Sequence, residues 1–287
     1  MTAPVESVTS IDLQVVVSPD VPAVLPEAVT FECGASRQEV SSSATYAYEH
    51  HGAEFTQEDP GALTMFFEDL VLGRPLPLKF ATRSIQDVDT LVALALFLQR
   101  DLAVQPTTPA FVAVVDLVHR RGVPLLGHLD RDLGGFLRFL RRLFPEGLAR
   151  QELGDRLGAA VAYIRDYLVD GRLPSVDLSW PEVRVMQTGT NGFVLAQTTG
   201  PLVEGWVELY RQGHLKGVLL GALGAASLAR KSVWVGFDLE RALGVLNALE
   251  EAAMGLPEWR LEGDFLLGPP GGSQIRPTDL LQLAIRL

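Results

Sequence analysis

A chain of 287 residues, 47% of them hydrophobic, is long enough to bury one large core or two medium ones. Its formal net charge of −11 argues against a long nucleic acid as partner, because duplex binding needs clustered lysines and arginines. The single cysteine, Cys33, cannot form an internal disulfide. We find no run of about 18 uncharged apolar residues and no basic segment leading into an apolar one, so a cytoplasmic protein that binds no membrane is expected.

The first part of the chain has the pattern of an α/β domain with a mixed or parallel sheet flanked by helices. Short β-branched or aromatic runs between polar loops predict strands, and apolar residues at helical spacing predict helices. The serine-rich segment 36–43 has loop composition. The predicted strands are 11–17, 28–31, 44–48 and 76–81, and the predicted helices are 60–72, 87–98, 109–121, one through 136–140, and 150–169.

From Trp180 onward the pattern changes to that of a smaller α+β domain. Residues 171–175 have linker composition, which predicts domains at 1–172 and 173–287. A glycine-rich loop, 268–276, precedes the last helix, where amides and a guanidinium can meet an anion. The expected elements are a hairpin of 183–187 and 192–197, helices at 202–212, 238–254 and 277–286, and strands at 217–220 and 232–237.

The triplet Glu49-His50-His51 ends the predicted strand 44–48 and holds two of the five histidines of the chain. Strand alternation points Glu49 and His51 to one side and His50 to the other, and ligands usually bind at strand ends in open α/β sheets. Neutral imidazole is a common ligand of divalent metals and a proton carrier near neutral pH. Adjacent surface histidines before a glycine turn are the equal alternative.

Acidic residues follow two further predicted strands. Glu32 stands after the strand 28–31, and Asp87 and Asp89 open the helix that follows the strand 76–81. Hard cations prefer carboxylate oxygens, so Asp-x-Asp at this junction predicts a cation site. Aspartate is also a favoured N-cap, and acids in the first turn complement the helix dipole, so a capping role is the alternative.

Two other polar positions have structural explanations. His119 lies in the last turn of the helix 109–121, where it is expected to satisfy helix-end carbonyls. Asp130 precedes a helix that carries several arginines, and an aspartate there can cap the helix. The local excess of arginine would suit a phosphate.

Together these motifs resemble the DHH phosphoesterase superfamily. Glu49-His50-His51 is similar to its Asp-His-His signature, and Asp87-Val88-Asp89 is similar to its Asp-x-Asp motif. Glu32 is similar to its strand-end acid and Asp130 to its later acid. The layout, a larger α/β domain followed by a smaller domain with a glycine-rich basic loop, also resembles the family.

The resemblance implies a two-metal phosphoesterase acting on a small phosphorylated compound or short nucleotide, with one or two Mn²⁺ or Mg²⁺ ions. It leaves open whether the chain forms a homodimer. The implied metal ligands are Glu32, His50, Asp87, Asp89 and Asp130. His51 would contact the phosphate, and the substrate side would comprise Gly271, Gly272, Ser273 and Arg276.

The sequence departs from the family pattern in three respects. Two aspartates are replaced by Glu32 and Glu49, the Asp-x-Asp motif follows the other two motifs instead of preceding them, and Arg83 stands where the family has a histidine. A guanidinium can pair with a carboxylate or phosphate but cannot ligate a metal or supply a hydroxide. Arg83 therefore predicts either a single-metal catalytic site or a catalytically silent one.

Two alternatives to a phosphoesterase stay open. One is a non-catalytic descendant that binds a nucleotide or a metal. The other is an interaction protein without a site, in which the acids cap helices and the histidines lie on the surface.

Overall fold

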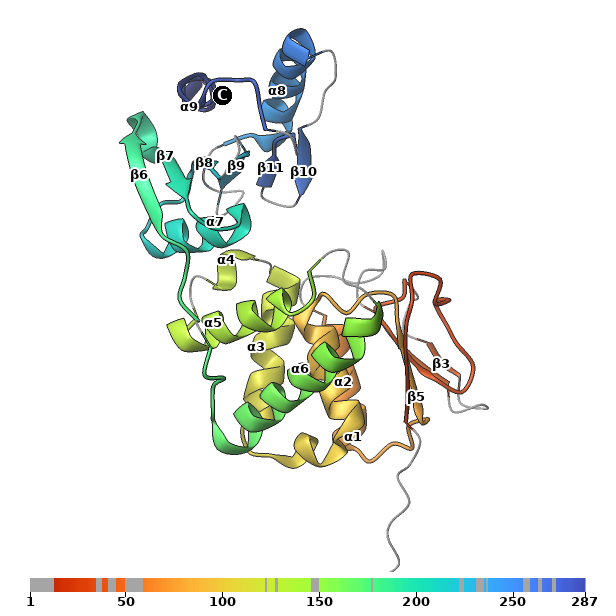
Figure 1. The fold of residues 1–287 in the computed structure, drawn as a ribbon. Coiled ribbons are helices and arrows are strands. Elements are labelled where there is room, and N and C mark those ends of the chain that lie inside the picture. Colours follow the sequence, from red (N-terminus) through yellow and green to blue (C-terminus); the bar gives the residue numbers. More distant parts are fainter. Residues whose placement is uncertain are drawn as a thin grey trace, which may run out of the picture. The chain divides into compact units, whose positions relative to one another are not determined.

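The computed structural model describes residues 13–34, 38–40, 45–49, 59–121, 123–126, 129–145, 150–176, 178–221, 225–230, 235, 237–254, 259–262, 265–269 and 272–286. The chain forms two compact units, each an arrangement of helices on a sheet, as expected for an α/β protein (Figure 1). The N-terminal unit comprises Met1–Gly122 and Gly135–Asp177, and the C-terminal unit comprises Val123–Gly134 and Leu178–Leu287. The division between Asp177 and Leu178 lies close to the expected boundary, but residues 123–134 belong to the C-terminal unit although they were expected in the N-terminal domain.

Four parallel strands form most of the N-terminal sheet, whose order is β1-β5-β2-β4-β3. They are β1 (Gln14–Val17), β5 (Lys79–Thr82), β2 (Val29–Phe31) and β4 (Thr45–Tyr48). The edge strand β3 (Gln38–Val40) pairs antiparallel with β4. Its position inside 36–43 corrects the expectation of a loop there, because an edge strand needs only one backbone partner and tolerates polar side chains.

The helices of this unit lie on one side of the sheet in Figure 1. Residues 91–98 of the central helix α2 are apolar on all sides. The helix is almost wholly buried because α1, α3 and α6 surround it, which confirms the prediction that it is buried. Phenylalanine ring contacts join the helices to the strands, as in the 6.3 Å edge-on contact of Phe31 in β2 with Phe66 in α1. The bounds are α1 (Ala62–Val71), α2 (Val88–Leu98), α3 (Thr108–Arg121) and α6 (Arg150–Asp170).

Parallel strands bring three polar side chains together at the carboxyl ends of the strands, which we call the carboxyl edge of this sheet. Phe31 at the end of β2 pairs with Tyr48 of β4 and with Thr82 of β5. The residues that follow these ends, Glu32, Glu49 and Arg83, therefore leave neighbouring strands at the same level. Neighbouring strands lie about 4.8 Å apart, so short side chains can meet across them.

The C-terminal unit is built on the sheet β10-β11-β9-β8-β7-β6, in which only β7 and β8 of the described pairs are parallel. Side chains alternate along β7: Val194 and Ala196 face α7, whereas Phe193 and Leu195 face α8 and α9. The strands are β6 (Val183–Thr188), β7 (Phe193–Thr198), β8 (Lys216–Leu220), β9 (Ala226–Arg230), β10 (Arg260–Glu262) and β11 (Phe265–Leu267).

The helices of this unit are α4 (Val123–Leu126), the start of α5 (Arg131–Arg142), α7 (Leu202–Arg211), α8 (Leu239–Met254) and α9 (Pro277–Arg286). Of the expected strand 232–237, residues 232–234 and 236 lie outside the described residues, and Phe237 lies outside any strand and packs edge-on against Phe193. The strand β9, at 226–230, was not expected. The small side chains of β9 weaken its hydrophobic signal. Among the helices of the described ranges, none combines the length and apolar character that a membrane crossing needs.

Replacing either of two glycines in α6, Gly154 or Gly158, by alanine is expected to stabilise the fold. A Cβ at either would meet no atom within 4 Å, and both line a cavity of about 460 Å³ beside α2 and β1. Each change to alanine is expected to raise the free energy of unfolding by about 1 kcal/mol, because glycine is the costlier residue inside a helix. Urea unfolding of the two variants checks this. Gly61→Ala is the opposite control, since its Cβ would collide with the Asp116 carboxylate.

A candidate metal centre at the carboxyl edge of the N-terminal sheet

Three donors from distant parts of the chain converge at this edge. Glu32, Asp89 and His119 each offer a ligand atom, and these atoms lie within 4.8 Å of one another. Glu32 follows β2, Asp89 lies in the first turn of α2, and His119 lies in the last turn of α3. Two carboxylates and an imidazole form a donor set that suits a divalent transition metal.

Glu32 is held in an uncommon backbone conformation. Its φ is 53°, in the left-handed region, and its amide donates to the Tyr48 carbonyl at 2.9 Å. The next turn residue, Gly34, has φ 80° and donates its amide to the buried carboxylate of Glu49. The turn after β2 is therefore tied to the end of β4, and the two glutamates are held close together.

Asp89 and His119 form the other side of the cluster. His119 Nδ1 lies 3.2 Å from Asp89 Oδ1, and the Asp89 side chain is only 2% exposed. One turn before His119, Asp116 accepts hydrogen bonds from the amides of Gly61 and Thr64. It also pairs with Arg120 at 2.9 Å. These contacts fix the end of α3 against the start of α1 and so orient the imidazole.

The cluster shifts two pKa values strongly upward. Burial raises the pKa of Glu32 to about 10, helped by the nearby charges of Asp89 and Glu49. Burial alone would lower the pKa of His119, but its hydrogen bond to Asp89 and the surrounding acidic charges raise that pKa to about 9. Both groups therefore hold protons at neutral pH when no cation is bound. The protons on Glu32 and His119 supply the two positive charges that a bound divalent cation would supply in their place.

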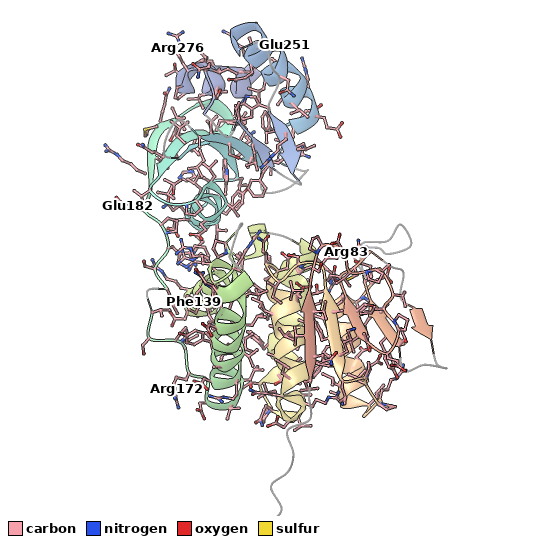
Figure 2. All side chains as sticks on the ribbon, turned by 45° about the vertical axis from the view of Figure 1, so that its right-hand side comes forward. Arg83, Phe139, Arg172, Glu182, Glu251 and Arg276 are labelled. Atoms are coloured by element: carbon pink, nitrogen blue, oxygen red, sulfur yellow. The ribbon has the colours of Figure 1, made fainter. Side chains whose placement is uncertain are left out.

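The other predicted ligands of this unit take different positions. Asp87 occupies the N-cap position of α2 without a side-chain capping bond, and its charge helps to raise the pKa of His119. His50 and His51 lie outside the described residues. Arg83 is exposed, and its Nε donates to the Val21 carbonyl at 2.8 Å (Figure 2).

Asp130 belongs to the C-terminal unit and has a capping role. Its Oδ1 accepts from the amide of Asp132 at 2.9 Å and from that of Leu133 at 3.4 Å, at the start of α5. The side chain is exposed. The capping alternative noted from the sequence is the one that these contacts support.

The predicted substrate loop has internal partners in the C-terminal unit. Ser273 Oγ donates to the buried carboxylate of Glu250 at 2.9 Å, which also accepts from the Trp259 indole. Gly272 has φ 91°, as a turn glycine, and Arg276 pairs with Asp279 at 2.8 Å (Figure 2). Gly271 is not among the described residues. The described part of this loop is thus fastened to α8 and α9.

His119 is the member of the cluster that the sequence did not single out as a ligand. From its place in the last turn of α3, His119 forms an ion pair with Asp89. A usable signal was present: Asp116, His119 and Arg120 recur at helical spacing and form a polar face on an otherwise apolar helix.

Comparison of the chain with family models, with curated proteins and with solved structures found no match.

Proposed function

We propose that the N-terminal unit binds a divalent cation, Mn²⁺ or Mg²⁺, through Glu32, Asp89 and His119 and hydrolyses a phosphate ester of a small compound. The observation that carries the proposal is the convergence of these three donors within 4.8 Å at the carboxyl edge of a parallel sheet. Ligands of open α/β folds bind at this edge.

The chemistry of the cluster supports a cation as its occupant. Asp89 is only 2% exposed, and the carboxyl group of Glu32 lies close to both Asp89 and Glu49, an arrangement that like-charge repulsion disfavours. A divalent ion would replace the two protons that relieve this repulsion, and ligands must lose their protons to bind it. When bound, such an ion activates water as a nucleophile and neutralises charge on a phosphate.

The residues of the chain would have separate roles in this site. Glu32, Asp89 and His119 would hold the cation. Glu49, through its bond from Gly34, would fix the turn that carries Glu32. Asp116 would hold the last turns of α3, which carry His119, against the start of α1.

The cation site is tested by titration with Mn²⁺. Binding is measured as the loss of the electron paramagnetic resonance signal of the free ion. Wild type is expected to bind with a Kd below about 1 mM. Asp89→Asn, His119→Gln and Glu32→Gln should each weaken binding by about 100-fold or more, a larger effect than loss of an outer partner typically has. Asp130→Asn, which changes an exposed capping acid, is the matched control and should bind as wild type does.

Catalysis is tested separately with mono- and diester nitrophenyl phosphates at saturating Mn²⁺. Turnover that disappears in Asp89→Asn supports the phosphoesterase. A second candidate, a metal-binding protein without turnover, is favoured by the exposed capping position of Asp130, which leaves three clustered donors in the described part of the chain. Failure of wild type to bind Mn²⁺ would contradict both functions.

A further inference from the structure

Resting on the proposed function, we infer that Arg83 is the residue that receives the phosphate group of the substrate. Its guanidinium stands next to the Glu32 turn, since Glu32 and Arg83 follow paired residues of β2 and β5. A Cβ on Gly34 would lie 3.3 Å from Arg83 Nη1, which places the guanidinium against the same turn.

Among the described residues the guanidinium makes one hydrogen bond, through Nε. Nε donates to the Val21 carbonyl at 2.8 Å, a bond that fixes the plane of the group. The side chain is exposed, and no carboxylate of the described residues pairs with it. Two terminal nitrogens of a guanidinium match two oxygens of a phosphate, so a fixed Arg83 can bind one bidentately.

The surrounding charge gives this arginine its selectivity for an anion held by a cation. The chain carries a net charge of −11, and the turn beside Arg83 carries Glu32, whose carboxyl group lies close to Asp89 and Glu49, so a free anion is repelled from this edge. With a divalent ion in the cluster, a phosphate can contact the ion and Arg83 together. The predicted order of binding is therefore cation first and phosphate second.

The test measures inorganic phosphate binding to the Mn²⁺-loaded protein by broadening of the phosphorus-31 resonance. Arg83→Gln should weaken phosphate binding by about tenfold or more, as loss of a charged hydrogen-bonding partner does. Its Mn²⁺ affinity should equal or exceed that of wild type, which also shows that the variant is folded. Arg100→Gln is the matched control, because Arg100 is an exposed arginine that donates to the Leu76 and Pro77 carbonyls just before β5, away from the cluster.

The outcomes separate this inference from the function on which it rests. Normal Mn²⁺ binding with unchanged phosphate affinity in Arg83→Gln overturns the role of Arg83 and leaves the cation site standing. Absence of Mn²⁺ binding in wild type overturns both. Should Arg83→Gln not fold, Arg83→Lys takes its place; it keeps the charge but not the fork, so weaker phosphate binding than wild type is still expected.

Discussion

Raising the pH from 7 to 9 without metal should destabilise the N-terminal unit by roughly 2 to 5 kcal/mol. The pKa of Glu32 is raised from 4.5 to about 10 and that of His119 from 6.5 to about 9. Above pH 6.5 the folded state therefore holds two protons that the unfolded state releases. Each such group lowers the free energy of unfolding by about 1 kcal/mol per pH unit until the pH reaches its folded pKa.

Urea unfolding in a chelator, with amide hydrogen exchange of α2 as the readout, measures this loss. Glu32→Gln cannot titrate and should remove about half of the pH dependence. Glu152→Gln, at an exposed acid paired with Arg156, is the control and should keep all of it. The window ends at pH 9 because burial also raises the pKa of Cys33, whose titration above that range would add to the effect.

The C-terminal unit offers an internal comparison in the same sample. All four tryptophans of the sequence fall within its segments, so tryptophan fluorescence reports on its unfolding. This transition should lack the pH dependence that α2 shows. Equal pH dependence of both signals, or a slope unaltered in Glu32→Gln, would refute the assignment of the shifted protons to the cluster.

Local patterns predicted most of the fold, and long-range packing accounts for what they missed. The apolar run 91–98 of α2 and the β-branched strand β1 depend on side chains within one segment, which a sequence displays directly. The strand β3 forms because β4 offers it a free edge, and its polar residues do not indicate that. Likewise, 123–134 joins the C-terminal unit through contacts such as that of Gly134 with Trp180, which lie far apart in sequence.

The same distinction applies to the candidate site. Glu32 and Asp89 could be singled out because a strand end and a helix start are visible in the sequence and meet in any parallel sheet of this kind. For His119 the sequence shows only that it belongs to a polar face of α3, and its meeting with Asp89 depends on how α3 packs against α2. The residue type of Asp130 suits a metal ligand as well as a helix cap. Its capping role follows from its hydrogen bond with a backbone amide at the start of α5, which the sequence does not display.

The apparent affinity for Mn²⁺ is expected to rise steeply with pH, by close to two powers of ten per pH unit between about pH 6.5 and 8.5. A metal ligand must be deprotonated, and the metal-free cluster holds one proton on Glu32 and one on His119 over this range. Binding of one ion should therefore release about two protons at pH 7. The cation thus displaces the same two protons whose loss in alkaline solution makes the metal-free unit less stable.

Calorimetric titration at pH 7 in buffers of different ionisation enthalpy counts the released protons. Glu32→Gln should release one fewer and show a slope near one, since its amide can ligate without losing a proton. Asp130→Asn should match wild type in both quantities. Binding of Mn²⁺ with no proton release would mean that Glu32 and His119 are not the groups that hold the ion, because their protons compete with any ion bound at that place.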